Sequence, residues 1–232
     1  MVELVSLGAI VLQGGIAAVL LTALRRRNAA AATNAFVSLS LSVLPLFLEY
    51  GSPFLLSGRL IVPPALPFWI AGAGFLHSVG MLGPYNDVWW WDHLTHAVSA
   101  ALVAALAYAG LLVAAEVPGA VGGSRGTVAL LTVGYTMAAG VLWELIELVA
   151  RQVGERYDVE PVLIHYGWRD TALDLVFDMV GALSVILLDV RIFVPLAEQF
   201  PVAAQELVLT AGATLLVGSL LLSAPLFVGG LR

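Results

Sequence analysis

The stretch Trp91-Asp92-His93-Leu94-Thr95-His96 decides the fold, because it sets an aspartate and two histidines at the start of the long apolar run Ala97–Ala115. Moving a charged side chain into hydrocarbon costs at least about 2.5 kcal/mol, so ionisable residues beside such a run are candidates for function. Two further polar clusters adjoin apolar runs in the same way, namely Trp143-Glu144-Leu145-Ile146-Glu147 and Asp170-Thr171-Ala172-Leu173-Asp174, with Asp178 one turn later. The chain therefore concentrates ionisable residues inside its apolar part.

The composition is that of a membrane protein. Hydrophobic residues make up 60% and charged residues 11% of the 232 positions, and the mean hydropathy is +0.97. A soluble domain carries about 25% charged residues. We therefore predict an all-α, polytopic transmembrane helix bundle that forms one integral membrane domain over residues 1–232, with a motif-bearing core at 89–194.

Missing residue types and the net charge exclude several classes of protein. The chain has no cysteine, which excludes disulfides and thiolate metal ligands. All ten basic residues are arginine, so a retinal Schiff base, which needs lysine, is excluded. The formal charge of −6 offers no basic surface for nucleic acid, and the expected partner is membrane lipid.

About seven segments approach the 20 or so apolar residues that cross a bilayer, and we expect six to seven spans. The second is short unless Ala29–Thr33 belongs to it, and Pro195 is expected to stop the sixth. A polar loop is expected over Arg151–Arg169. The predicted spans are Leu4–Leu24, Ala35–Glu49, Pro67–Leu82, Trp89–Ala115, Thr127–Ala150, Asp170–Phe193 and Leu207–Val228.

The arginines predict an orientation in the plasma membrane. With the N-terminus outside and the C-terminus inside, seven arginines face the inner side and three the outer side, as the positive-inside rule favours. The inner set is Arg25, Arg26, Arg27, Arg151, Arg156, Arg169 and Arg232, and the outer set is Arg59, Arg125 and Arg191.

The three polar clusters are expected to meet at one level of the bundle, since consecutive spans are antiparallel. Residues three or four apart share a helix face. This spacing joins Asp92 to His96 and Glu144 to Glu147, and a stripe runs along Asp170, Asp174 and Asp178. His77 is expected at the same level, where we interpret it as a hydrogen-bonded histidine rather than a ligand.

This pattern predicts a metal site. Several carboxylates in one dehydrated pocket require protonation or a bound cation. Mixed imidazole and carboxylate ligands favour Zn, Fe or Mn over Mg, and helical bundles build such sites from pairs at these spacings. The predicted metal ligands are His96, Glu144, Glu147, Asp170 and Asp174, and the predicted catalytic residues are Asp92, His93 and Glu144. No site for another cofactor is predicted.

Other interpretations of these residues stay open. Asp92 and Asp170 fit helix capping, because acidic residues are favoured at helix starts. His93 fits a position at the headgroups beside Trp89 to Trp91. Glu147 fits a solvated place in the interface, and the whole network fits a role in fixing helix packing alone.

At these residues the chain resembles the YjdF-like family of polytopic inner-membrane proteins. The resemblance rests on Trp91-Asp92 with His96, on Glu144 with Glu147, and on Trp168-Arg169-Asp170-Thr171 with Asp174 and Gly181-Ala182. The layout is similar, more distantly, to VanZ-like membrane proteins. Asp178 is not part of the family pattern, so the resemblance does not support it as a ligand, and it implies no particular activity.

The leading functional hypothesis is a metal-dependent enzyme that acts on a lipid or isoprenoid-type substrate at the inner leaflet. In it, Asp92 orients a histidine from outside the ligand set. The alternatives are a proton- or cation-coupled transporter or channel, whose carboxylates take up and release the ion, and a non-catalytic accessory protein.

Overall fold

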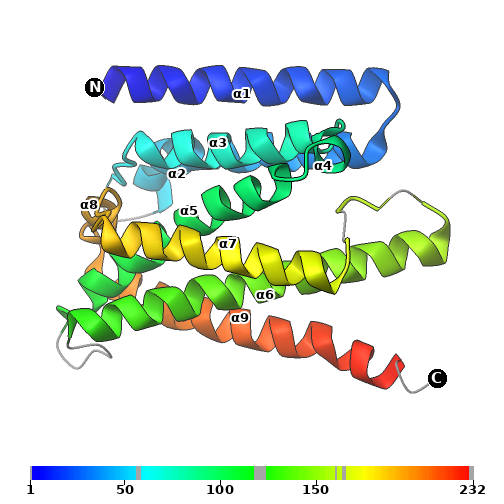
Figure 1. Ribbon diagram of the computed structural model, residues 1–232. Coiled ribbons are helices and arrows are strands. Elements are labelled where there is room, and N and C mark those ends of the chain that lie inside the picture. Colours follow the sequence, from blue (N-terminus) through cyan, green and yellow to red (C-terminus); the bar gives the residue numbers. More distant parts are fainter. Residues whose placement is uncertain (1, 56–58, 118–123, 160, 164–165, 230–232) are drawn as a thin grey trace. The chain divides into compact units, whose positions relative to one another are not determined.

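The computed structural model describes residues 2–55, 59–117, 124–159, 161–163 and 166–229, and all regular structure in this part is helical (Figure 1). This confirms the predicted all-α class. The helices are α1 (Val2–Arg25), α2 (Ala29–Leu55), α3 (Ala65–Gly80), α4 (Pro84–Asp87), α5 (Trp91–Ala114), α6 (Arg125–Tyr157), α7 (Trp168–Leu187), α8 (Val194–Ala197) and α9 (Pro201–Gly229).

Five of these helices, α1, α2, α5, α6 and α9, are long and apolar enough to cross a membrane. The shorter helix α3 is also apolar and makes a sixth candidate. Helix α7 has 20 residues but carries Arg169, Asp170, Asp174 and Asp178. The chain is therefore a multi-pass helical membrane protein, and the sixth predicted span, which corresponds to α7, holds the acidic stripe.

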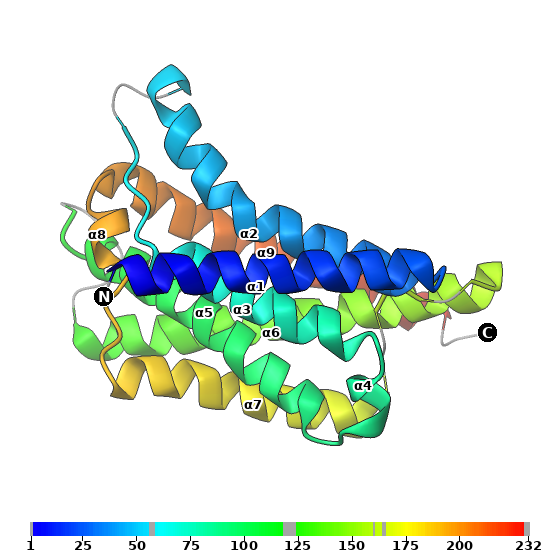
Figure 2. The same ribbon diagram turned by 90° about the horizontal axis from the view of Figure 1, so that it is seen from above.

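The chain divides within α5 into two compact units, Met1–Thr95 and His96–Arg232. In the first unit α1, α2 and α3 pack against one another (Figures 1 and 2). Ile16 and Ala71 form part of its core. A Cβ atom added at Gly8 or Gly15 would come within 2.7 Å of a phenylalanine ring of α3, so glycine allows α1 and α3 to approach closely.

In the second unit α6 packs against both α7 and α9. Helix α7 also lies directly on the second-unit part of α5. A Cβ atom at Gly181 would lie 2.5 Å from the carbonyl oxygen of Ala97 and 2.8 Å from the amide nitrogen of Ala101. Only a residue without a side chain fits there, and this contact holds α7 against Ala97 and Ala101 of α5.

Two helices are longer than the sequence predicts. Helix α2 begins at Ala29 and continues to Leu55, through Pro45 and Pro53, so it extends beyond the predicted span Ala35–Glu49 at both ends. Helix α6 continues to Tyr157, and the loop predicted from Arg151 is wrong over its first turns. Arg151 donates to Glu155 one turn later at 2.8 Å, a pairing that favours helix.

Helix α7 ends earlier than predicted, at Leu187 rather than Phe193. Asp189 adopts a left-handed backbone conformation with φ of 49°, which cannot continue a right-handed helix. Pro195 begins the short helix α8 instead of ending α7, as proline commonly does in a first turn. Much of the segment 116–126, which joins the fourth and fifth predicted spans, lies outside the described residues.

Candidate functional site

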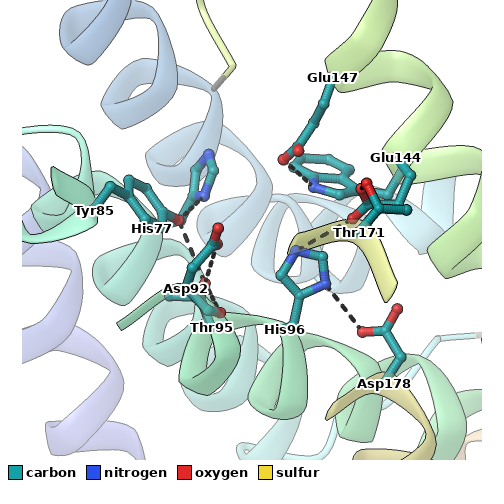
Figure 3. Close-up of polar contacts among 10 residues, drawn as sticks. His77, Tyr85, Asp92, Thr95, His96, Glu144, Glu147, Thr171 and Asp178 are labelled. Carbon is teal, nitrogen blue, oxygen red and sulfur yellow. Dashed lines mark hydrogen bonds and ion pairs between the residues drawn. The ribbon is translucent and has the colours of Figure 1, made fainter. Parts of the chain in front are cut away.

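The candidate site of the second unit is built around the imidazole of His96, which is only 8% exposed. Its Nδ1 lies 3.2 Å from Oδ1 of Asp178, and its Nε2 lies 3.8 Å from Oε1 of Glu144 (Figure 3). Both ring nitrogens therefore face carboxylates from other helices. The first distance is that of a hydrogen bond, while the second is longer than one.

Glu144 comes from α6 and is held by the start of α7. The hydroxyl group of Thr171 donates a hydrogen bond of 2.6 Å to Oε2 of Glu144 (Figure 3). This bond fixes one carboxylate oxygen and leaves Oε1 directed toward His96. Glu144 is buried, and its position depends on the close approach of α6 and α7.

Asp178 comes from α7 and is 3% exposed. It occupies space that Gly140 on α6 leaves open, since a Cβ atom on Gly140 would lie 3.2 Å from Cγ of Asp178 and closer still to Oδ2. Oδ1 contacts His96, while Oδ2 is buried and accepts no hydrogen bond from any residue that the structure describes. A buried carboxylate oxygen without a donor is costly and calls for a proton or a cation.

Asp174 lies one turn before Asp178 on the same face of α7 and is 2% exposed. Ligand atoms of Asp174 and His96 lie within 4.8 Å of one another. Asp170, one further turn back and partly exposed, brings a carboxylate oxygen within the same distance of Asp174. Asp170 is not the N-cap of α7, because that position is Gly167, but it lies in the first turn, where the helix dipole favours an acid.

Glu147 lies one turn after Glu144 on α6. The indole Nε1 of Trp143 donates to its Oε1 at 2.7 Å, a bond within the same helix. Glu147 is 8% exposed, and this burial disfavours the interpretation of a solvated interfacial residue. Its role as a metal ligand stays a prediction.

Asp92 and His93 lie in the first turn of α5 and belong to the first unit. The hydroxyl group of Thr95 donates to the backbone oxygen of Asp92 at 2.7 Å and lies 3.4 Å from its Oδ1. His93 is buried, and its ring meets that of Trp89 edge to face with centroids 6.4 Å apart. The predicted catalytic roles of Asp92 and His93 stay predictions.

Acidic residues and a histidine of the second unit thus cluster where a metal could bind. Three buried carboxylates, from Glu144, Asp174 and Asp178, surround one imidazole. If all three carboxylates are ionised, the cluster holds an excess of two negative charges even when His96 is protonated. Imidazole and carboxylate oxygen together form a ligand set typical of Zn, Fe or Mn.

Two residues of this cluster were not predicted as part of the site. The family resemblance does not support Asp178 as a ligand, yet its carboxylate lies within hydrogen-bond distance of His96. Its position four residues after Asp174 was the signal that could have placed it. The sequence carries no comparable signal for Thr171, because a threonine at the start of a helix is common. Its hydrogen bond to Glu144 becomes visible only when α7 is packed on α6.

A comparison with models of protein families finds a match over most of the chain. Residues 7–194 match the family model described as "Predicted membrane protein (DUF2238)". The chain belongs to this family. The DUF2238 match includes every helix that contributes to the cluster and ends before α9. It does not confirm the YjdF-like resemblance, and no likeness to VanZ-like proteins is shown.

A second comparison finds a relative in Thermotoga maritima, a protein that carries the description "Uncharacterized protein". The two chains are 28% identical over 130 residues, which is 53% of this DUF2238 chain and 61% of the relative's length. No solved structure matches the chain.

Proposed function

We propose that this chain is a plasma-membrane metalloenzyme that binds a divalent metal and acts on a lipid or isoprenoid-type substrate at the inner leaflet. The observation that carries the proposal is the position of His96, buried between Glu144 and Asp178 with both ring nitrogens facing carboxylates. In this proposal His96, Glu144 and Asp174 hold the metal. Asp178 does not bind the metal but forms a hydrogen bond with His96 and so fixes the orientation of its ring.

The distances support this division of roles. Two ligand atoms that each bind one ion at about 2.1 Å are at most about 4.2 Å apart. The 3.8 Å between Nε2 of His96 and Oε1 of Glu144 fits this limit, and a ligand atom of Asp174 lies within 4.8 Å of one of His96. Nδ1 of His96 is then the donor to Asp178, the arrangement in which a carboxylate fixes the tautomer of a metal-binding histidine.

The hydrogen bonds around the cluster support a preformed site. Thr171 donates a hydrogen bond to Oε2 of Glu144, which leaves Oε1 directed toward the histidine. Gly140 leaves the space in which the Asp178 carboxylate lies. The ligand side chains therefore need little reorganisation to bind an ion, which lowers the cost of binding.

The remaining predicted residues surround this set. We propose that Asp170, within 4.8 Å of Asp174, and Glu147, one turn from Glu144, complete the coordination or hold a second ion. Asp92 precedes His96 by one helical turn, and we propose that it and His93 exchange protons with the substrate. Glu144 doubles as the base of the catalytic set.

The proposed substrate follows from the location of the cluster. α5 and α6 are long and apolar enough to span a membrane, and both contribute to it. We therefore propose a substrate that dissolves in the bilayer, as a lipid or an isoprenoid does. A divalent ion, when bound, supplies Lewis acidity and makes a bound water more acidic. The inner leaflet follows from the arginine distribution, with the N-terminus outside.

Elemental analysis of protein purified in detergent tests the proposal. We expect a stoichiometric divalent metal, and a lower melting temperature in chelator, since a ligand that binds only the folded state stabilises it. Glu144→Gln and Asp174→Asn keep the side-chain volume but remove an anionic ligand. Each should lower metal affinity by at least about 10–100-fold, the loss seen when only outer-shell partners are removed.

Glu49→Gln is the matched control, because Glu49 lies on α2 of the first unit and pairs with Arg59 at 3.5 Å. It should bind metal like the parent. A parent protein without metal and without sensitivity to chelator would contradict the site. Full metal content in both amide variants would exclude Glu144 and Asp174 as ligands.

A further inference from the structure

The first unit contains a series of hydrogen bonds that the proposed metal site does not use. It is centred on His77 of α3, whose Nε2 lies 2.8 Å from Oδ1 of Asn34 and whose Nδ1 lies 2.5 Å from the hydroxyl oxygen of Tyr85 (Figure 3). The series joins three helices, because Asn34 lies on α2 and Tyr85 on α4.

The partners of Asn34 determine the tautomer of His77. The amide nitrogen Nδ2 of Asn34 donates to the backbone oxygen of Ala30 at 3.1 Å, so the amide oxygen is the atom that faces the imidazole. An oxygen accepts, and Nε2 of His77 must therefore carry a hydrogen. In the neutral ring Nδ1 is then the acceptor, and the hydroxyl group of Tyr85 donates to it.

The series continues from Tyr85 toward α5. The hydroxyl oxygen of Tyr85 lies 3.4 Å from Oγ1 of Thr95, which in turn lies 3.4 Å from the carboxylate oxygen Oδ1 of Asp92. Thr95 is only 4% exposed, so water has little access to this step. Gly80 supports the geometry, since a Cβ atom there would lie 2.5 Å from the ring of Tyr85.

We propose that His77 is a proton store that exchanges a proton with the carboxyl group of Asp92 through Tyr85 and Thr95. The bond from Tyr85 to Thr95 and the bond from Thr95 to Asp92 set the direction of transfer. Protonated His77 gives its Nδ1 proton to the Tyr85 oxygen, Tyr85 gives its own proton to Thr95, and Thr95 gives its own to the Asp92 carboxylate. Each hydroxyl loses one hydrogen and gains one. The net change is an imidazolium and a carboxylate becoming a neutral imidazole and a carboxylic acid.

The environment of His77 suits the charged form as well as the neutral one. When Nδ1 gains a hydrogen, Nε2–H still donates to Asn34 and Nδ1–H donates to Tyr85, so both ring nitrogens keep a partner. The hydroxyl hydrogen of Tyr85 then turns toward Thr95. Tyr85 faces His77 from α4, the uncharged Asn34 faces it from α2, and the carboxyl group that the series reaches on α5 is that of Asp92.

This inference does not depend on a metal, and its test uses metal-free protein. The chain has four histidines, so protein in nanodiscs with ¹⁵N-labelled imidazoles gives NMR signals from four rings. The signals that are missing in His77→Gln belong to His77. The first expected result is the Nε2–H tautomer for His77 in the parent at neutral pH. An Nδ1–H tautomer would overturn the proposal without any substitution.

The second measurement is the rate at which His77 exchanges between its neutral and protonated forms, read from ¹⁵N line shapes at its titration midpoint. Tyr85→Phe and Thr95→Val each remove one hydroxyl with little change in shape. We expect each to slow the exchange by about 100-fold, a typical contribution of a positioned proton-transfer group. Thr95→Val also keeps the test decisive if Tyr85→Phe fails to fold.

Two variants serve as controls. Tyr50→Phe alters a tyrosine that is 71% exposed, and Thr22→Val removes a hydroxyl that bonds only the backbone of its own helix at Ala18. Both should exchange at the parent rate. Parent-like exchange in Tyr85→Phe or in Thr95→Val, with the fold intact by circular dichroism, would refute the proton path.

Discussion

Replacing Gly140 by alanine gives a sharp test of the contact between Asp178 and His96. The added methyl carbon would lie 3.2 Å from Cγ of Asp178 and 3.2 Å from Cδ2 of Leu175, and closer still to Oδ2 of Asp178. To regain van der Waals contact the carboxylate must move by roughly 1 Å. The 3.2 Å contact to Nδ1 of His96 then exceeds hydrogen-bond distance.

The expected change in stability is small because two effects oppose each other. Overpacking of a core costs about 1–3 kcal/mol, whereas alanine in place of glycine inside a helix gains about 1 kcal/mol. We expect a net loss of roughly 0–2 kcal/mol in the free energy of unfolding. The effect on metal binding is larger, since losing the partner of a metal-binding histidine lowers affinity by about 10–100-fold.

Titration calorimetry with Zn²⁺ or Mn²⁺ measures the affinity, and thermal unfolding in detergent measures stability. Gly134→Ala is the matched control, because it lies on the same helix and its added carbon would meet nothing within 4 Å. The control should bind metal like the parent and be slightly more stable. Equal metal affinity in Gly140→Ala and Gly134→Ala would refute the role given to Asp178.

Three further substitutions follow from single contacts. Gly181→Ala should destabilise the fold by about 1–3 kcal/mol in thermal unfolding, because the added carbon meets the backbone of α5, and parent-like stability would contradict that packing. Thr171→Val removes the donor to Glu144 and should lower metal affinity by about 10–100-fold in the same calorimetry, with unchanged affinity counting against a preformed site. At Asp189, hydrogen bonds from Arg191 and Tyr108 hold the carboxyl pKa below its ordinary value of 3.8, so its stabilising effect is present above that pH and is lost as pH falls through the lower folded value. The melting temperature of Asp189→Asn should therefore fall less steeply than the parent's below pH 3.8, and parallel curves would contradict the contact.

Much of the site follows from helical periodicity and alternation of direction. Glu144 on one helix and Asp174 on the next are near the same level because neighbouring spans run in opposite directions. Spacing also put Asp174 and Asp178 on one face of α7. These regularities need no knowledge of packing, and they located His96, Glu144 and Asp174 correctly beside one another.

The details that packing decides were out of reach of the sequence. Which carboxylate meets Nδ1 of His96 depends on Gly140, whose missing side chain opens space for Asp178 rather than for Asp174. The end of α7 depends on one residue, Asp189, in a left-handed conformation, although hydrophobic residues continue to Phe193. The hydropathy of the sequence predicts neither the space at Gly140 nor the left-handed conformation of Asp189.

In the proposed site, His96 binds a divalent metal together with carboxylates. X-ray absorption spectroscopy of the purified protein loaded with Zn²⁺ measures this directly, because imidazole gives a distinctive multiple-scattering signal. We expect one imidazole nitrogen and several oxygen ligands at about 2.0–2.2 Å. The imidazole signal should vanish in His96→Gln and persist in His77→Gln. A signal that survives His96→Gln, or a parent that binds no metal, would contradict the claim.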